Sequence, residues 1–203
     1  MEIDPEKLNA RELYRLLTGI VVPRPIAWVT SVSARGVVNA APFSAFTWVS
    51  TDPAMLGFSA GLRDGKPKDT GRNIEAAGHY VVHIADENLI EKLHLSAVDH
   101  PEDVSEVAEL ELTPLSGKMI GTPRIGEAPV AMECVLDRIL EFGRTRAQFI
   151  IGRVVYIHIR DGLCADGKID TASLRPISRL GGPKYAKLGE IVEMSKQFHI
   201  GPR

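Results

Sequence analysis

The sequence predicts an α+β protein in which an antiparallel β-barrel carries a few helices on its outside. Three observations support this fold class. Short apolar segments with strand patterns alternate with turn residues over much of the chain, as in antiparallel sheets. Two later segments, 131–142 and 147–159, are long enough to be the curved strands of a barrel. Helical periodicity is confined to a few short stretches, which predicts helices that pack around the sheet.

The composition is that of one globular domain spanning residues 1–203, with 44% apolar and 25% charged residues. The net charge of −2 and the lack of a basic cluster argue against a nucleic-acid-binding protein. The apolar runs are too short to span a bilayer, and the first residues lack the pattern of a signal peptide. We therefore expect a cytoplasmic protein that binds neither nucleic acid nor membrane.

The cysteines and histidines show no metal-site spacing. Cys134 and Cys164 lie 30 positions apart without a CxxC motif, so both are expected to be reduced core residues. None of the six histidines belongs to an HExxH motif or another metal-binding pattern. His83 and His158 lie in strand patterns, where structural histidines with satisfied hydrogen bonds are expected. The sequence therefore predicts no metal site.

The first predicted element is a helix. Asp4 is a favourable N-cap, Pro5 suits the first helical position, and Gly19 provides a stop signal. Three leucines should form its apolar face: Leu13, Leu16 and Leu17. Two prolines, Pro23 and Pro25, then favour extended chain.

The strands follow in order along the chain. Residues 26–33 and 37–41 form a predicted hairpin around a turn at 34–36. Residues 46–50 and 55–59 form a second pair, separated by a turn at Asp52-Pro53. The next strand is 80–84, and the two long strands are joined by residues 143–146.

Helices are expected at two further places, 70–77 and 86–97, the second with one apolar face. The acidic segment 99–113 is expected to cover the surface. The tail from Ser178 is glycine-rich and then weakly helical.

The segment KPKDTGRNI, residues 66–74, is the strongest candidate binding site. Lys68, Thr70 and Asn73 could hold a phosphate together with the unpaired backbone N–H groups at the start of a helix. Asp69 is a carboxylate beside this proposed anion, and we expect it to cap the helix and point away. The alternative interpretation is a charged, capped loop on a solvated face.

The segment 36–53 interleaves small and aromatic residues. The small side chains would let backbone amides approach a flat ligand, and the aromatic rings would wall it in. The alternative is an ordinary barrel corner with core aromatics. The small residues are Ala40, Ala41, Ser44 and Ala45, and the aromatic ones are Phe43, Phe46 and Trp48.

The motif GFSAG, residues 57–61, matches the G-x-S-x-G pattern of serine hydrolases. That elbow requires a strand before the serine and a helix after it, whereas loop residues follow here. Asp69 and either His79 or His83 supply the other residue types of a triad in the right chain order, but the structural context of the serine is wrong. We expect Ser59 to be a strand-end hydroxyl near the same pocket, and a hydrolase remains a remote alternative.

Four stretches in order resemble the flavin reductase-like family of FMN-binding split barrels. They are RPIAWVTS (24–31), NAAPFSAFTWVSTDP (39–53), KDTGRNI (68–74) and HYVVHIA (79–85), and the likeness continues loosely to RLGGPKYA (179–186). This resemblance implies a six-stranded antiparallel split β-barrel. It also implies non-covalent FMN at the interface of a homodimer.

The resemblance also implies roles for individual residues. Thr30 and Ser31 would lie near the ring or ribityl chain, and Ser44, Ala45 and Phe46 would line the isoalloxazine through backbone amides. The phosphate would be surrounded by Ser59, Lys68, Thr70 and Asn73. Asn39 and Arg24 are further candidates for the cofactor site, without an assigned part of the cofactor. No side-chain acid or base is required for hydride transfer to a flavin, so no catalytic residue is nominated.

The expected function is an FMN-binding oxidoreductase of the NAD(P)H-dependent flavin reductase type. The two-component flavin reductases usually carry Asn-Ser-Phe where this chain has Ser44-Ala45-Phe46. The chain is more similar to the flavoredoxin-like branch, and this leaves the use of NADH or NADPH open. The second hypothesis is a non-enzymatic FMN-binding electron-transfer protein.

Overall fold

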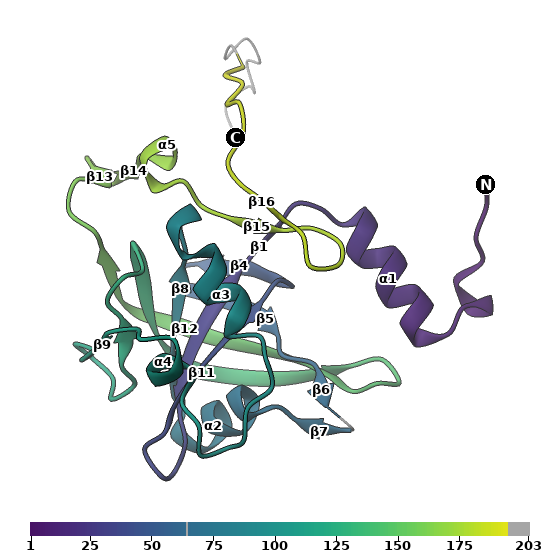
Figure 1. The fold of residues 1–203 in the computed structure, drawn as a ribbon, viewed down its shortest axis with the longest axis horizontal. Helices are drawn as coiled ribbons and strands as arrows, with labels where there is room; N and C mark the ends of the chain where they lie inside the picture. Colours follow the sequence, from purple (N-terminus) through teal and green to yellow (C-terminus); the bar gives the residue numbers. More distant parts are fainter. Residues whose placement is uncertain (64, 195–203) are drawn as a thin grey trace.

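A computed structural model describes residues 1–63 and 65–194 and has a large antiparallel sheet at its centre (Figure 1). The sheet has seven strands in the order β3-β2-β8-β11-β12-β5-β4, one more than the six expected. Their bounds are β2 Ala27–Val32, β3 Val38–Phe43, β4 Phe46–Thr51, β5 Ala54–Ser59, β8 His79–Ile84, β11 Val130–Phe142 and β12 Ala147–Ile159.

The two edge strands β3 and β4 follow one another in the chain. Only Ser44 and Ala45 separate them, so the two edges of the sheet are held together at one corner. The sheet therefore curls into a barrel that is split between these strands. The predicted turns at 34–36, 52–53 and 143–146 are confirmed, and each joins two adjacent antiparallel strands.

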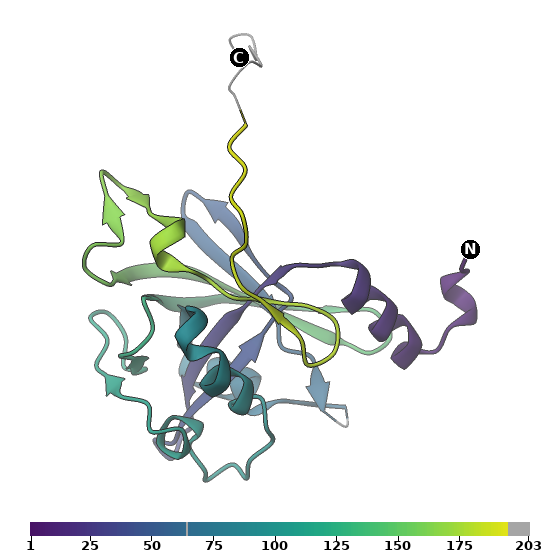
Figure 2. The same ribbon diagram turned by 45° about the horizontal axis from the view of Figure 1, so that its top comes forward.

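Short strands and helices surround this sheet (Figures 1 and 2). One of the small sheets has three strands in the order β1-β15-β16, and it pairs the segment after α1 with the C-terminal hairpin. The short strands are β1 Arg24–Pro25, β6 Leu62–Arg63, β7 Lys66–Pro67, β9 Pro114–Leu115, β10 Arg124–Ile125, β13 Cys164–Ala165, β14 Lys168–Ile169, β15 Ser178–Arg179 and β16 Tyr185–Ala186. The α-helices are α1 Ala10–Ile20, α2 Asp69–Ala77, α3 Ile90–Leu95, α4 Glu106–Glu109 and α5 Thr171–Leu174, and the 3-10 helices are Pro5–Lys7 and Glu87–Leu89.

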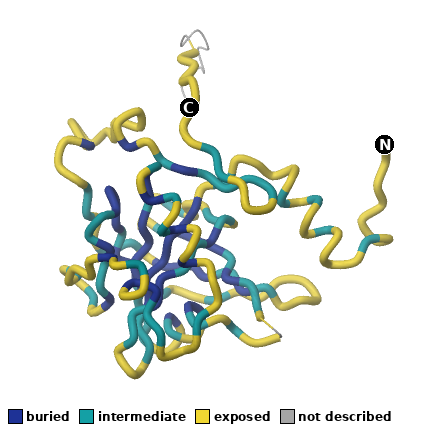
Figure 3. The backbone as a smooth tube through the Cα atoms, viewed as in Figure 1, coloured by how far each residue is buried: buried dark blue, intermediate teal, exposed yellow. Residues whose placement is uncertain are grey.

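The core lies on both faces of the sheet, and β2 shows why. Ala27 and Val29 point into the barrel, where they pack with Phe58 and Tyr80. Trp28 points to the opposite face and its indole N–H donates to the Ser96 hydroxyl at 2.9 Å, beyond the end of α3. Because side chains alternate between the two faces of a strand, β2 is buried on both sides. In Figure 3 the buried residues, in dark blue, gather in the central sheet.

The N-terminal prediction was wrong in its boundaries. Asp4 caps only the 3-10 helix, whereas α1 begins after Asn9, whose side chain forms a capping box with Glu12. Gly19 lies inside α1 and does not end it. The helix has no buried residue and extends away from the barrel in Figures 1 and 2, so its apolar face is outside the core.

Four further expectations are corrected. The helix predicted at 86–97 is a 3-10 turn followed by α3, which ends at Leu95. The acidic segment 99–113 is not wholly superficial, because Glu106 and Val107 on α4 are buried. Cys134 is a free core cysteine, but the free Cys164 is exposed. The tail forms β15 and β16 and has no helix between Ser178 and Met194; the rest of the predicted weak helix lies outside the described residues.

None of the helices within the described ranges has both the length and the apolar character needed to cross a membrane.

Candidate functional site

Four residues predicted from three motifs lie close together where α2 packs on the β2–β3 hairpin. Ser31 on β2 is the register partner of Asn39 on β3, and α2 packs against both strands. The Asn39 side-chain amide donates to the Thr70 hydroxyl oxygen at 3.0 Å and to Ser31 Oγ at 3.5 Å. Asn73 donates to the same Ser31 oxygen at 3.3 Å. Strand pairing and helix packing thus connect the β2–β3 hairpin to the start of α2 through a mostly buried polar cluster.

The start of α2 has the electrostatics of an anion site. Its N-cap residue, Lys68, makes no side-chain cap hydrogen bond, so the first backbone N–H groups lack that partner. Partial desolvation lowers the pKa of the Lys68 ammonium below its ordinary value, and the nearby Arg63 guanidinium lowers it further. Both effects disfavour the charged ammonium, and a bound anion would offset them.

Asp69 does not cap α2, contrary to expectation. It lies within the first turn of the helix, and its carboxylate pairs with Arg72 one turn later. The same Arg72 also pairs with Glu102 at 2.6 Å. Arg72 therefore compensates the charge of Asp69, which itself lines a small cavity at the start of α2.

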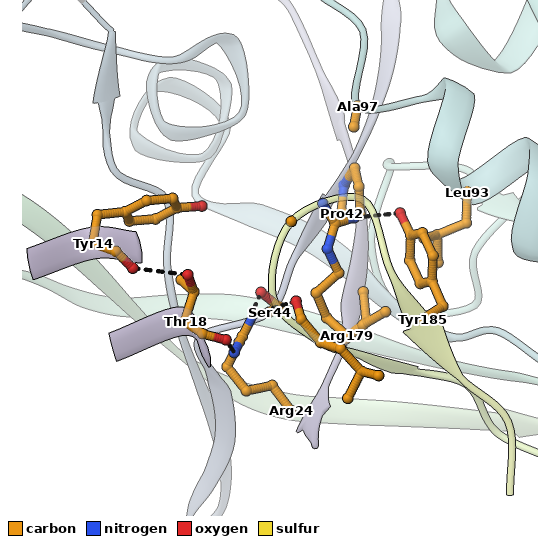
Figure 4. A pocket seen from close by; sticks show the side chains of 12 residues that line it. Tyr14, Thr18, Arg24, Pro42, Ser44, Leu93, Ala97, Arg179 and Tyr185 are labelled. Atoms are coloured by element: carbon orange, nitrogen blue, oxygen red, sulfur yellow. Dashed lines mark hydrogen bonds between the residues drawn. The ribbon is translucent and has the colours of Figure 1, made fainter. Parts of the chain in front are cut away.

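Two cavities run from this cluster along the corner of the barrel. A small one of about 80 Å³ is lined by Asn39, Lys68 and Thr70, among others. A larger one of about 240 Å³ lies next to it, and Pro42 and Ala97 line both. The lining of the larger cavity combines apolar and aromatic side chains with two arginines (Figure 4): Tyr14, Thr18, Arg24, Ile26, Pro42, Ser44, Leu93, Ala97, Arg179, Leu180, Gly182 and Tyr185. Together they form a groove with a polar end at α2 and a more apolar end at the C-terminal hairpin.

Arg24 anchors the wall of the larger cavity. Its Nε donates to Ser44 Oγ at 3.3 Å, which ties the β3–β4 corner to β1. Its other nitrogens donate to three backbone carbonyls, those of Thr18 at 2.7 Å, Val21 at 2.6 Å and Leu180 at 3.0 Å. One side chain therefore joins the end of α1, the barrel corner and the tail around the cavity.

The opposite wall comes from residues that the sequence interpretation did not assign to the site. The guanidinium of Arg179 lies 4.6 Å from the centre of the Tyr185 ring and donates to its hydroxyl oxygen (Figure 4). His94 on α3 lies 3.0 Å from that hydroxyl through Nδ1. The stretch RLGGPKYA, which contains both hairpin residues, was the available signal. Tyr14 on α1 had no signal in the sequence.

Ser31 and Asn73 of the polar cluster, and the remaining predicted residues, do not line either cavity. Thr30 faces the other side of β2 and donates to the Pro123 carbonyl at 2.7 Å. Ala45, Phe46 and Ser59 adjoin the corner without lining either cavity, and the Ala45 carbonyl accepts the Ser59 N–H at 2.9 Å.

Of the three aromatic residues near this corner, only Phe43 lines a cavity. It packs against Phe58 in the barrel core, with ring centres 4.9 Å apart. Trp48 is 72% exposed on the barrel surface.

In the part of the chain that the structure describes, Ser59 has no candidate catalytic base. The strand β5 leads into the short strand β6, so the helix required by a nucleophile elbow does not follow. His79 bonds Thr122 at 2.7 Å, and His83 is buried between the Trp28 carbonyl and the Ile125 N–H. Within residues 1–63 and 65–194, no histidine is hydrogen-bonded to Ser59, and no group of three His, Cys, Asp or Glu side chains could hold a metal ion.

Comparison with known proteins identifies relatives over almost the whole chain. A family model described as "Flavin reductase like domain" matches residues 19–172. An uncharacterized protein of Halalkalibacterium halodurans is 41% identical over 201 residues, which cover 97% of this chain and 96% of that protein.

Solved structures are also similar to this chain over nearly its full length. Nitrilotriacetate monooxygenase component B from Bacillus cereus is 40% identical, with a TM-score of 0.93 and coverage of 96% of this chain and 98% of that one. The 2-nitrobenzoate 2-nitroreductase of Pseudomonas fluorescens is 31% identical, with a TM-score of 0.90 and coverage of 100% and 99%. At the level of fold alone, a Shewanella frigidimarina protein with a split barrel domain has a TM-score of 0.84 at 19% identity, covering 96% of this chain and 98% of its own.

Proposed function

We propose that this chain, which belongs to the flavin reductase-like family, is an FMN-dependent oxidoreductase that takes electrons from NADH or NADPH. The observation that carries the proposal is the groove along the barrel corner. One end has the Lys68 ammonium and the helix N–H groups that favour a phosphate, although Asp69, Asp99 and Glu106 also line it. The other end has the apolar and aromatic lining of a ring site. We further propose that residues 1–203 form one domain of this type.

The residues present fit FMN. Lys68 and the first N–H groups of α2 would hold the phosphate, because cations and unpaired helix N–H groups both favour anions. Thr70 is oriented by the hydrogen bond from Asn39, and Asn73 by its bond to Ser31. A second pyrophosphate-binding loop has no candidate in the sequence, which favours FMN over FAD.

The ring end of the groove would be formed by the β3–β4 corner and the C-terminal hairpin. Arg24 holds Ser44 at that corner, and Pro42 continues the wall toward the phosphate end. Flavin supplies the hydride and electron chemistry when bound, and the protein orients it and adjusts its potential. Because proton transfer by a side chain is not required for the flavin to accept a hydride, we assign no catalytic residue.

The names of two relatives support an oxidoreductase. One is a component of nitrilotriacetate monooxygenase and the other a nitroreductase, and both are similar to this chain over nearly its full length. The second candidate is an FMN-binding electron-transfer protein. It is favoured by Ser44-Ala45-Phe46, where the two-component reductases usually carry Asn-Ser-Phe, and it would hold FMN without oxidising nicotinamide.

Reduction by nicotinamide distinguishes the two candidates. The purified protein should be yellow and should release FMN on denaturation. Mixing with NADH or NADPH in a stopped-flow instrument should bleach the visible absorbance, and oxygen or free flavin should restore it. If dithionite bleaches the absorbance but neither nucleotide does, the electron-transfer function is the correct one. A colourless protein that does not bind added FMN would contradict both.

A further inference from the structure

Two arginines of the groove lie directly opposite one another on adjacent strands. Arg24 on β1 is the register partner of Arg179 on β15, and both side chains line the larger cavity. Like charges in directly opposed cross-strand positions destabilise a sheet, so this arrangement has an energetic cost. A bound negative charge would remove that cost.

The protein itself does not neutralise either guanidinium. Among the described residues, no carboxylate lies within ion-pair distance of Arg24 or Arg179. Arg24 donates to three carbonyls and a hydroxyl, which are neutral acceptors. Arg179 contacts the face and the hydroxyl of Tyr185, which are also neutral. Both residues are half-buried, so solvent screens their charges less than at an exposed site.

The position of the pair in the groove indicates which part of a ligand it would meet. The phosphate end, at Lys68 and Thr70, lines the smaller cavity and not the larger one. Pro42 and Ala97 connect that cavity to the one containing the two arginines. A ligand with its phosphate at α2 would therefore extend its ring toward Arg24 and Arg179.

We infer that Arg24 and Arg179 together stabilise the negative charge that a flavin ring acquires when it takes up two electrons and one proton. This inference rests on the proposed binding of FMN in the groove. The electrons come from the nicotinamide donor or, in the test below, from dithionite. Oxidised FMN has a neutral ring, so the arginine pair favours the reduced state over the oxidised one. Both arginines would act through the electric field of their charge, and neither donates a proton in this role.

The test compares the affinities for oxidised and reduced FMN in three variants. Arg179→Gln removes one charge and keeps a donor for Tyr185, whereas Arg179→Lys keeps the charge. Arg146→Gln is the matched control, because Arg146 lies in the exposed turn between β11 and β12 and, among the described residues, pairs only with Glu141. Fluorescence titration gives the affinity for oxidised FMN, and an anaerobic dithionite titration against a reference dye gives the midpoint potential of the bound flavin.

We expect Arg179→Gln to weaken binding of reduced FMN about tenfold relative to oxidised FMN, which lowers the two-electron midpoint potential by ~30 mV. Arg179→Lys should keep most of the wild-type potential, and Arg146→Gln should leave it unchanged. The inference is overturned if Arg179→Gln, folded by circular dichroism, retains the wild-type potential, or if Arg179→Lys lowers it equally. If the wild-type protein fails to bind oxidised FMN, the proposed function fails first and this inference fails with it.

Discussion

The side-chain amide of Asn39 donates a hydrogen bond to the hydroxyl oxygen of Thr70 across 3.0 Å. These residues are 31 positions apart in the chain and belong to two different predicted motifs, one on the β2–β3 hairpin and one on α2. Both are buried, so the bond holds the Thr70 hydroxyl in one orientation at the start of the helix. The polar end of the groove is thus oriented before any ligand arrives.

Lys68→Ala and Thr70→Ala should each weaken FMN binding by roughly ten- to a hundredfold. A charge-assisted contact to a phosphate contributes about 1.5–3 kcal/mol. Lys68 is exposed, so its truncation should leave the fold intact, whereas Thr70→Ala also removes the buried acceptor of the Asn39 amide. Fluorescence quenching of added FMN measures the affinity, and thermal unfolding shows whether the fold is intact. Lys168→Ala, at the exposed strand β14, is the control and should bind FMN like the wild type. Unchanged affinity in both site variants would make residues 66–74 a capped surface loop.

Gly152→Ala should destabilise the protein, whereas Gly19→Ala should not. A Cβ at Gly152 would lie 2.3 Å from the hydroxyl oxygen and 2.8 Å from the Cζ of Tyr80, whose side chain is fully buried. Overpacking of this kind costs about 1–3 kcal/mol. At Gly19, inside α1, nothing lies within 4 Å, and alanine should stabilise the helix by about 0.5–1 kcal/mol. Urea denaturation of both variants measures the difference, and equal stabilities would contradict the packing described at Tyr80.

Stability should fall on acidification because of His83. Burial lowers the pKa of this imidazole to about 4 from an ordinary value of 6.5. Its Nδ1 donates to the Trp28 carbonyl and its Nε2 accepts the Ile125 N–H, so the neutral ring satisfies both bonds and protonation breaks one. The unfolded chain therefore binds the proton more readily between pH 4 and 6.5, and stability is lost as the pH falls through that window.

The contribution of His83 should be about 2 kcal/mol between pH 7 and pH 5. Urea denaturation at the two pH values measures it, with His83→Gln as the variant that cannot titrate. The difference in unfolding free energy between the two pH values should be smaller in His83→Gln by that amount. An identical pH dependence in the two proteins would refute this assignment.

The protein should be a homodimer with its flavin sites near the interface. The family implies this arrangement, and the structure leaves Trp48 and Val49 on β4 exposed together with the apolar face of α1. Trp48→Asp should weaken association at least about tenfold, since buried aromatic residues dominate interface energies. Thr47→Asp, which introduces the same charge at the neighbouring position of β4, is the control. Sedimentation equilibrium gives the dissociation constants, and a wild-type monomer that binds FMN at full affinity would contradict the dimer.

The strand pattern of the barrel could be predicted because it depends on local information. Alternating apolar residues and turn signals identify the hairpins around 34–36, 52–53 and 143–146, and tertiary contacts do not change that pattern. The helix boundaries were less accurate where two N-cap candidates compete. Asn9 and Glu12 form a capping box that Asp4 lacks, and this moves the start of α1 to Ala10.

The polar end of the candidate site was predicted from sequence because Lys68, Thr70 and Asn73 lie within one short segment at a helix start. Only the tertiary structure could decide the other end. Arg24 and Arg179 are 155 positions apart, and they face one another only because β1 pairs with β15. Tyr14 and His94 come from two further segments, α1 and α3, and neither has a local pattern that marks a ligand. Sequence patterns report local backbone preference, whereas a cavity depends on which distant segments pack together, and that is set by the fold as a whole.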